Sequence, residues 1–581
     1  MARYDVKYEH MLSIRENIIG SVVSALKKEF PDQDVLNFEV ASAKTAEHGE
    51  YATNIAFILS KKVARSPRDV AEQLKKNLEH NVLFEKIEIA GPGFINFFLK
   101  KTVLQETLSR IHASKEKFGG SDSMKGKKIM VEFAHPNTHK AFHIGHLRNI
   151  CLGSALVRIF ESQSAHVFRA NYQGDIGLHV AKFLWAYMKN KKPANFKTHT
   201  EKTQFLGAVY AEGAKAYEDD ELAQAEIKDI NRRLYLKDPK LMGMWEETRT
   251  WSLEYLEEIY RRLGAHFDRL FFESEVFELG KKTVQEGLKK GIFEESEGAV
   301  VFPGEKYGLH TRVFVTKEGH PTYEGKEMGL VKMEVEAFPF DKTVHVVANE
   351  QDGYFQVVIK AIELLMPELK NKKKHLSYGI VKLASGKMSS RTGEVITAEF
   401  LIDAVEKAVS KAISNEDLSN EERQTVIATV ALGAIKYVML HSTAKNDIVF
   451  DLKKAVQFEG DSGPYLQYGY ARIASILRKV KGGGFSAESD FSECNELDWL
   501  LMRQLLYFEE VVKYAADDLS THHITHYLLE LTATFSRWYD ANRVEGEKEV
   551  LKNARLYIIS GVAQVLKNGL NLLGIEVIEK M

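Results

Sequence analysis

Cysteines and long apolar runs are both scarce in this chain of 581 residues. Two cysteines, Cys151 and Cys494, are too few for a disulfide framework, so we expect a reducing, cytoplasmic environment. No window offers the roughly eighteen uninterrupted apolar residues that a membrane span needs. The N-terminus carries acidic residues early and lacks a continuous apolar segment, which makes it a poor signal peptide. We therefore expect no contact with a membrane.

The chain also lacks a strong charge of either sign, because its formal net charge is only −2. A nucleic-acid partner would have to be held by local basic patches and not by the field of the whole molecule. Hydrophobic residues make up 44% and charged residues 28%, which is typical of a globular protein. The length indicates about three to four domains.

Residues 1–118 carry the pattern of an α+β domain. Apolar residues recur at helical spacing over 49–64 and again over 66–78, where Ser66-Pro67 is a favourable helix start. Residues 84–100 alternate between apolar and polar, with a turn at Gly91-Pro92-Gly93, and predict two strands. The segment 118–128, rich in Gly, Ser and Lys, predicts a linker.

Residues 119–402 predict a Rossmann-type domain with a doubly wound parallel sheet. A strand over 127–133, a helix over 146–163 and a strand over 165–172 form a parallel unit, and 342–349 and 377–385 predict further buried strands. A charged helical insertion is expected at about 190–300, and the basic run 370–374 is interpreted as a solvated loop. The fold class is thus α/β and multidomain.

Residues 403–581 predict an all-α domain, because only helical patterns follow about residue 398. Its last helix carries an apolar stripe at positions 558, 559, 562, 565, 566 and 570, which should face a core. Residues 481–490 interrupt the domain as an expected exposed loop.

Four histidines, at positions 135, 139, 143 and 146, stand where the first strand of the Rossmann-type domain meets its first helix. A zinc site is one interpretation, but Pro136 makes one helix through all four improbable, and no HExxH or carboxylate has ligand spacing. Strand-to-helix junctions of this kind bind phosphate at free helix N–H groups. His143 and His146 could donate hydrogen bonds to a phosphate, and Gly145 would let a base approach the backbone. The structural alternative is that these histidines only cap the helix.

A second segment far downstream favours the phosphate interpretation. Glycines at 386 and 393 bound a cationic, hydroxyl-rich stretch that could close over a triphosphate, namely Lys387, Met388, Ser389, Ser390 and Arg391. The two segments together resemble the HIGH and KMSKS signatures of class I aminoacyl-tRNA synthetases. We therefore expect Gly145, His143, His146 and this loop to bind ATP, with His143, His146 and Lys387 acting in catalysis.

Several stretches narrow the resemblance to arginyl-tRNA synthetases. They are VEFAHPNTHKAFHIGHLRN, NYQGDIG, FEGDSGPYLQYGYARI and the ending NGLNLLGIEVIEKM, with GEYATN and GPGFINF in the N-terminal domain. The resemblance implies ligation of L-arginine to its tRNA through arginyl-adenylate, with tRNA bound before the adenylate forms. It also implies an arginine pocket made by Glu132, Asn137, Tyr323, Glu327 and Gln351. Glu132, Glu327 and Tyr323 would hold the guanidinium and the other two the α-amino and carboxylate end, although the family usually has Asp where Glu327 stands.

The resemblance further implies that the helical domain binds the anticodon. The matching positions are Tyr465, Tyr468, Tyr539 and the terminal Met581, and aromatic side chains commonly stack on unpaired bases. Core packing is the alternative for each tyrosine. Asn54 and Phe57 match positions that contact the corner of the tRNA from the N-terminal domain.

One position departs from the signature, because Ser390 stands where KMSKS has its second lysine. We predict that Lys140, three residues before His143, supplies the missing charge to the ATP phosphates from the opposite wall, although a role for Arg391 stays open. Mg²⁺ is expected with ATP and no metal site of the protein itself. We expect a monomer, although no pattern in the sequence bears on oligomeric state. Two rival functions stay open: another HxGH nucleotidyltransferase, and a non-catalytic tRNA-binding paralogue.

Overall fold

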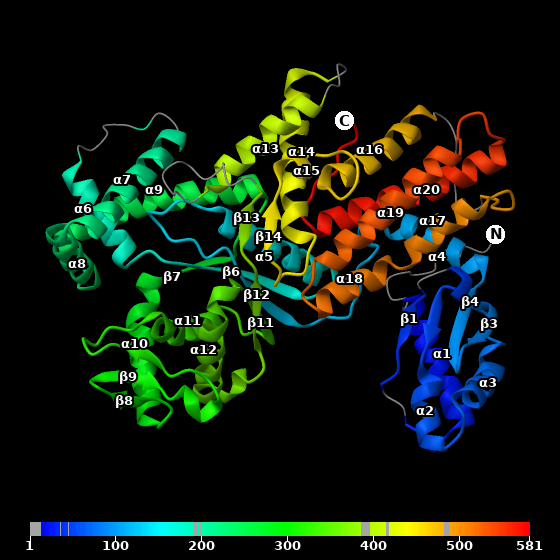
Figure 1. The fold of residues 1–581 in the computed structure, drawn as a ribbon, viewed down its shortest axis with the longest axis horizontal. Coiled ribbons are helices and arrows are strands. Elements are labelled where there is room, and N and C mark those ends of the chain that lie inside the picture. The colour runs from blue at the N-terminus through cyan, green and yellow to red at the C-terminus, as the bar shows by residue number, and fades with distance from the viewer. Residues whose placement is uncertain are drawn as a thin grey trace.

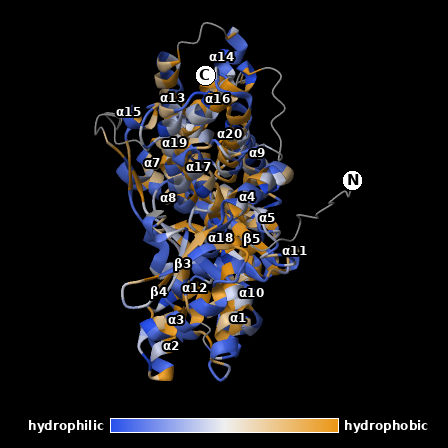
Figure 2. Cartoon of the chain, turned by 90° about the vertical axis from the view of Figure 1, so that its right-hand side faces the viewer, coloured by the Kyte–Doolittle hydropathy of each residue, from blue (hydrophilic) through white to orange (hydrophobic). Residues whose placement is uncertain are grey.

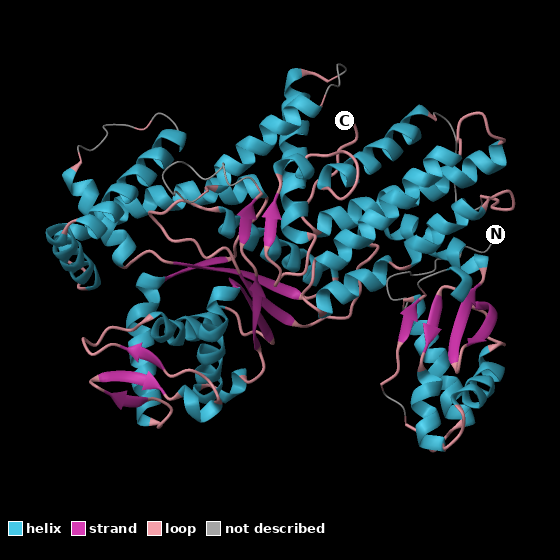
Figure 3. Cartoon of the chain, in the orientation of Figure 1, coloured by secondary structure: helices cyan, strands magenta, loops and turns pink. Residues whose placement is uncertain are grey.

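The computed structural model describes residues 13–34, 37–43, 46–190, 196, 199–384, 396–413, 418–480 and 489–581. Figure 1 shows a small N-terminal lobe, a central sheet with helices on either side, and a layer of long helices built by the C-terminal part of the chain. Helices dominate, and the strands gather in the N-terminal lobe, the central sheet and two smaller sheets (Figure 3).

The N-terminal lobe is an antiparallel sheet of order β1-β2-β4-β3 packed on three helices. Its elements are α1 (Ile14–Glu29), β1 (Val40–Ser42), β2 (Tyr51–Thr53), α2 (Ile55–Val63), α3 (Pro67–Leu78), β3 (Phe84–Ala90) and β4 (Phe94–Leu99). The predicted start of α3 is confirmed, because the Ser66 side chain accepts from the Asp69 backbone N–H. The prediction of one helix over 49–64 was wrong at its start. Tyr51 and Thr53 are buried on a strand between β1 and β4, and tertiary pairing outweighs local spacing there.

The central sheet has five parallel strands in the order β12-β11-β5-β6-β7. The strands are β5 (Lys128–Glu132), β6 (His166–Gln173), β7 (Arg269–Phe272), β11 (Lys342–Ala348) and β12 (Lys373–Tyr378). The chain enters at β5, builds outward through β6 and β7, and then returns to add β11 and β12 on the other side. The doubly wound sheet is therefore confirmed, and its switch point lies between β5 and β11, where ligands bind in such folds.

Helices connect the N-terminal lobe to this sheet, surround the sheet and form the insertion. They are α4 (Lys101–Ser114), α5 (Ile144–Ser162), α6 (Leu178–Lys189), α7 (His199–Asp219), α8 (Glu221–Tyr235), α9 (Pro239–Leu263), α10 (Glu273–Lys289), α11 (Tyr323–Ala337) and α12 (Asp352–Leu365). The insertion is helical over a shorter range than the expected 190–300. After Leu263 the chain returns to the central sheet as β7, and β8 (Glu294–Ser296), β9 (Ala299–Phe302) and β10 (Arg312–Val315) form a small antiparallel sheet.

Two further predictions in this region need correction. The segment 377–385 does not form one strand, because β12 ends at Tyr378 and a separate β13 (Val381–Leu383) pairs with β14 (Ile448–Phe450). The basic run 370–374 is not a solvated loop throughout, since Lys373 begins β12 and is buried. Its ammonium group forms an ion pair with the buried carboxylate of Glu334.

The C-terminal part is helical apart from β14. Its helices are α13 (Ala398–Ala412), α14 (Asn420–Leu440), α15 (Leu452–Ala455), α16 (Gly463–Lys479), α17 (Glu496–Leu506), α18 (Phe508–Asp517), α19 (His522–Ala541) and α20 (Glu549–Leu572). The predicted stripe on α20 is confirmed, because Ile558, Ile559, Val562, Val565, Leu566 and Leu570 are all buried. Most of the expected loop, residues 481–488, lies outside the described residues.

Most helices carry both hydrophilic and hydrophobic residues along their length (Figure 2). Among the described residues, no helix combines the length and the apolar character that crossing a membrane requires.

Candidate active site

Three residues in the loop from β5 to α5 have an unusual backbone conformation. Ala134, His135 and His139 have φ values of 79°, 48° and 62°, a region that non-glycine residues seldom occupy. The His139 ring is held between the hydroxyls of Thr138 and Thr248, each 2.9 Å from a ring nitrogen. Burial lowers the pKa of His139 to about 3, so this ring is neutral and serves to hold the loop.

His143 and His146 meet face to face at the start of α5. Their ring centroids are 3.7 Å apart with 23° between the planes. His143 Nδ1 accepts from the backbone N–H groups of Gly145 and His146 at 3.1 and 3.4 Å, and His146 Nδ1 accepts from the His143 N–H at 3.2 Å. The capping role is therefore real, and it occupies one nitrogen of each ring.

This capping pattern fixes the tautomer of both rings. Because Nδ1 accepts a hydrogen bond, the proton of each neutral imidazole is on Nε2, which is left as a donor. Burial lowers the pKa of His143 to about 4 and holds that of His146 well below its usual range, and Lys140 adds repulsion in both cases. The helix start thus offers two neutral N–H donors beside one cation.

Lys140 is half-buried in the same loop, three residues before His143. Its Nζ lies 5.5 Å from the centre of the Tyr210 ring on α7, and burial lowers its pKa. Its charge also lowers the pKa of His143, His146 and His179, so Lys140 interacts electrostatically with all three rings. This position is compatible with the predicted reach toward phosphate.

The chain that follows the second signature segment lies beside the first. Ile144 N–H donates to Ile396 O at 3.0 Å, and Ala398 N–H donates to Phe142 O at 2.8 Å, so the chain after the segment pairs with the start of α5. Lys387, Met388, Ser389, Ser390 and Arg391 themselves lie outside the described residues.

Two buried carboxyls mark the place where the sequence predicts the arginine pocket, which we call the acidic pocket below. Glu132, the last residue of β5, is 1% exposed, and Glu327 on α11 is 6% exposed. Tyr354 on α12 donates to Glu327 Oε1 at 3.2 Å, and the buried hydroxyl of Tyr172 on β6 has no hydrogen-bond partner among the described residues. Burial, reinforced by the charge of Glu132, raises the pKa of Glu327 to about 8. Two buried carboxyls that repel each other are suited to a cationic ligand.

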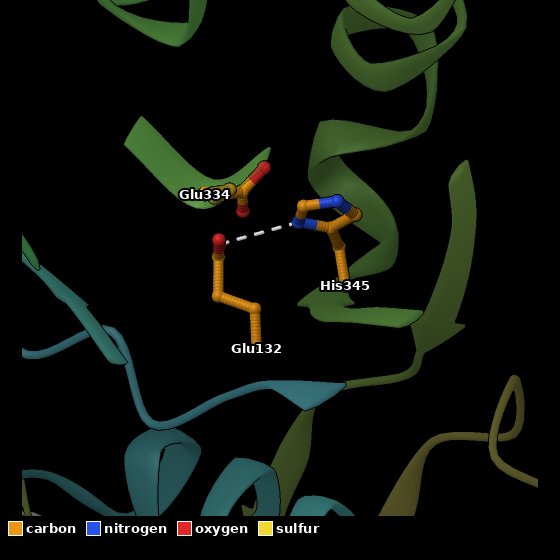
Figure 4. A group of neighbouring side chains, drawn as sticks. All are labelled: Glu132, Glu334 and His345. Carbon is orange, nitrogen blue, oxygen red and sulfur yellow. Dashed lines mark ion pairs between the residues drawn. The ribbon is translucent and has the colours of Figure 1, made fainter. Parts of the chain in front are cut away.

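Figure 4 shows Glu132 together with Glu334 and His345, whose ligand atoms lie within 4.8 Å of one another. His345 Nδ1 is 3.2 Å from Glu132 Oε1, while Glu334 Oε2 lies 2.7 Å from the ammonium nitrogen of Lys373. A metal ion would compete with that ammonium for the same carboxylate. We therefore interpret the group as a charge network and not as a metal centre.

The other predicted pocket residues make contacts of different kinds, and two of them are exposed. Asn137 forms a bridge to Gly174 after β6, and its side chain lies so close that a Cβ at Gly174 would be 2.2 Å from its Oδ1. Tyr323 begins α11 and is 64% exposed, with its ring 5.1 Å from Lys326 Nζ, and Gln351 is exposed just before α12. Tyr172 and Tyr354 escaped the sequence prediction, although Tyr172 lies within the NYQGDIG motif.

The helical domain presents a layered aromatic site. The Arg472 guanidinium lies between two rings, 4.7 Å from the centre of Tyr468 on the same helix and 4.6 Å from that of Tyr539 on α19. Its Nη2 also donates to the Tyr468 hydroxyl at 2.9 Å. Tyr539 is 40% exposed, so part of this layer faces solvent. Arg472 was not predicted, because nothing local to the sequence shows that it lies between the two tyrosines.

The remaining residues predicted to bind tRNA make packing contacts or hydrogen bonds within the protein. Tyr465 packs on the core and its hydroxyl is 3.2 Å from Ser536 Oγ, and Met581 is half-buried against the same core. Asn54 caps no backbone group of α2 with its side chain but accepts from the Glu39 N–H at 3.0 Å. Phe57 packs edge-on against Phe94, which is exposed on the same lobe.

Comparisons with known families match nearly the whole chain. Residues 16–99 match "Arginyl tRNA synthetase N terminal domain", 107–452 match "tRNA synthetases class I (R), catalytic domain", and 466–581 match "DALR anticodon binding domain". The arginine–tRNA ligase of Treponema denticola is 33% identical over 99% of this chain and 100% of its own. That of Bacteroides fragilis is 31% identical over 98% and 100%.

Solved structures of arginyl-tRNA synthetases are similar to this chain along nearly its whole length. The arginyl-tRNA synthetase of Thermus thermophilus superposes with a TM-score of 0.84 at 25% identity, covering 98% of this chain and 100% of its own. The arginyl-tRNA synthetase of Plasmodium falciparum, 20% identical, shares the fold with a TM-score of 0.80 over 98% and 100% of the two chains.

Proposed function

Since the chain belongs to the arginyl-tRNA synthetase family, it is an arginine–tRNA ligase, and we propose how its residues divide the work among arginine, ATP and tRNA. The carboxylate of arginine attacks the α-phosphorus of ATP, and pyrophosphate leaves. A hydroxyl of the terminal adenosine of the tRNA then attacks the arginyl carbonyl, and AMP leaves.

Arginine lies in the acidic pocket. Glu132 and Glu327 flank the guanidinium, and the Tyr323 hydroxyl completes its hydrogen bonds, because a buried guanidinium needs carboxylate partners. Asn137 and Gln351 hold the α-amino and carboxylate end. The longer side chain of Glu327, where the family usually has Asp, is anchored by the hydroxyl of Tyr354.

ATP lies across the start of α5. The Nε2–H groups of His143 and His146 donate to the α-phosphate as charge develops on it, and Gly145 leaves room for the base. Lys387 with Met388, Ser389, Ser390 and Arg391 holds the leaving pyrophosphate, and Lys140 adds a charge from the opposite wall. Mg²⁺ enters bound to ATP as part of the substrate.

The tRNA spans the two outer domains. Residues 1–118 contact its corner through Asn54 and Phe57, residues 119–402 hold the chemistry, and residues 403–581 bind the anticodon. Tyr468 and Tyr539 stack on unpaired bases, and Tyr465 and Met581 support the same face. Both cysteines are free, in keeping with the cytoplasm as the working place of this protein, which we take to be a monomer.

The observation that carries the proposal is the meeting of two neutral imidazole donors and two buried carboxyls at one switch point. Arginine-dependent exchange of pyrophosphate into ATP, measured with and without tRNA, tests it. Exchange that needs both arginine and tRNA is the expected result. Binding of tRNA with no exchange would instead indicate a non-catalytic paralogue, and exchange without any amino acid would indicate another nucleotidyltransferase.

A further inference from the structure

A third buried carboxyl, that of Glu334, lies beside Glu132. Glu334 stands on α11, two turns beyond Glu327, and is completely buried. One of its oxygens forms an ion pair with the ammonium of Lys373 on β12, at 2.7 Å. Its carboxyl lies beside that of Glu132 in Figure 4, although the two belong to different elements.

Each of these two carboxyls, which offer oxygens within 4.8 Å of one another, has one oxygen that lacks a donor among the described residues. Glu132 Oε2 and Glu334 Oε1 are both buried, and neither has a hydrogen-bond partner among the described residues. Two such oxygens repel each other when both groups are ionised, and leaving them unsatisfied is costly. A single proton between them would remove both penalties.

The surroundings do not supply enough positive charge to replace that proton. Within the described part of the chain, Lys373 is the one ammonium that contacts the group, against the three carboxyls of Glu132, Glu327 and Glu334. His345 on β11 and His135 after β5 are buried, and burial lowers the pKa of His135 to about 4 and that of His345 well below its usual range. The neighbouring phenols, Tyr172 on β6 and Tyr354 on α12, are neutral, and His375 on β12 turns to Asp352 at 3.6 Å.

Building on the proposed arginine pocket, we propose that Glu334 is a positioning residue that shares a proton with Glu132 while the pocket is empty. When a guanidinium binds between Glu132 and Glu327, its permanent charge replaces that proton, which passes to the solvent. Glu334 is then an ionised partner of Lys373, and both oxygens of Glu132 are free to accept from arginine. Arginine binding and proton release become linked.

The directions of the pKa shifts agree with this geometry. Burial raises the pKa of Glu334 to about 7, with Lys373 opposing the shift and Glu132 adding to it, and the pKa of Glu327 is raised to about 8. Near neutral pH the empty pocket therefore holds at least one proton that a cation can displace. Because binding favours the ionised carboxyls, the affinity for arginine should increase with pH and level off above about pH 8.

Calorimetric titration of the full chain with L-arginine, repeated in buffers of different ionisation enthalpy, measures the protons released. The titration is done with and without tRNA, at pH 6, 7 and 8. For the unaltered protein we expect release of about one proton at pH 7, and an affinity that rises by up to about tenfold per pH unit below pH 7. Binding with no proton release would overturn the proposal.

The variant Glu334→Gln keeps the shape of the side chain but cannot ionise. Proton release should fall by at least about half, and the affinity should match the unaltered protein at pH 6 but be about tenfold weaker at pH 8. The matched control is Glu286→Gln, which breaks an exposed pair with Lys332 between α10 and α11 and should change neither quantity.

The outcomes separate the two proposals. Undiminished proton release in Glu334→Gln would show that Glu327 alone is the source and that Glu334 has only a structural role. Failure of the unaltered protein to bind arginine at any pH, with or without tRNA, would instead overturn the proposed arginine pocket itself.

Discussion

At the scale of single residues, burial decides what each acid in the pocket can do. Glu132 ends a central strand with no solvent beside it, so its carboxylate can be satisfied only by a ligand or by a neighbour. His345 offers a ring nitrogen at 3.2 Å, but the second oxygen has no donor among the described residues. Such a group is poised for a guanidinium, which presents parallel N–H donors to both oxygens.

Glu132→Gln should therefore weaken arginine binding by roughly 2–5 kcal/mol while leaving ATP binding nearly unchanged. The amide keeps the shape of the side chain but removes the charge and turns one acceptor into a donor. Arginine-dependent exchange kinetics give the KM for each substrate. An unchanged arginine requirement would remove Glu132 from the pocket.

The unaltered enzyme should also discriminate against lysine by about 10⁴, since lysine leaves buried acceptors unpaired.

Lys140→Ala should slow adenylate formation by about 10²–10³, the usual effect of losing a preorganised donor to the transition state. Its ammonium already lies close enough to His143 and His146 to depress their pKa. Single-turnover adenylate formation with bound tRNA measures the rate, and Arg391→Ala and the double variant serve as comparisons. A wild-type rate for Lys140→Ala beside a crippled Arg391→Ala would move the missing charge back to the signature loop.

At the scale of elements, α16 and α19 together build a surface that neither helix has alone. The Arg472 guanidinium contacts two tyrosine rings, and holding these rings in place should lower the entropy that a stacked base would otherwise cost. Tyr465, one turn away on α16, is partly buried against the core instead, and its hydroxyl contacts Ser536.

Tyr468→Ala should weaken tRNA binding by roughly 1–3 kcal/mol if a stacked base is lost, with little change in melting temperature. Tyr465→Ala is the matched comparison, because its ring packs on the core and its loss should chiefly lower the melting temperature. Filter binding of the tRNA and thermal unfolding separate the two effects. Core packing would be the sole role of Tyr468 if its removal lowered stability without changing tRNA affinity per folded molecule.

The sequence predicts elements well where one periodicity persists. The stripe on α20, the cap of α3 and the strand-helix-strand unit from β5 to β6 could be foreseen because each depends on neighbours in the chain. β2 and β14 could not, since each has three residues and exists only through pairing with distant strands.

Contacts between distant residues limit the prediction of the site as well. Glu132 and Glu327 could be placed by their motifs. Lys373 lies within a basic run, and the sequence alone predicts that it is solvated, because its partner Glu334 is on another element. Arg472 is comparable, because its second ring, Tyr539, comes from a different helix. Partners of this kind are set by tertiary packing and leave no local pattern.

At the scale of the whole molecule, the N-terminal lobe is fixed to the helical domain (Figure 1). Arg503 on α17 pairs with Glu50 at 2.8 Å, and Lys513 on α18 pairs with Glu16 on α1 at 2.9 Å. Since these two regions are proposed to hold the corner and the anticodon of one tRNA, their docking sets the distance between the two contacts.

A buried carboxyl in this interface should make the docking depend on pH. The Tyr51 hydroxyl, from β2, donates to Glu510 Oε1 on α18 at 2.5 Å. Burial raises the pKa of Glu510 to about 7, with opposing contributions from Tyr51 and Arg15 and reinforcing ones from Glu509 and Glu16. A carboxyl with a raised pKa binds more protons in the folded state, so its contribution to stability is lost as the pH rises from about 4.5 through 7.

Glu510→Gln should remove this dependence, because an amide keeps the partner for Tyr51 but does not ionise. For the unaltered protein we expect the free energy of unfolding to fall by up to about 3 kcal/mol between pH 5 and pH 8, and for the variant the fall should be clearly smaller. Denaturant unfolding and hydrogen exchange in β2, measured at both pH values, give the global and the local effect. Glu493→Gln, which alters an exposed pair with Lys548, is the control and should behave like the unaltered chain. Equal pH dependence in both variants would show that Glu510 does not govern the docking, and that the pH sensitivity of the interface arises from other carboxyls.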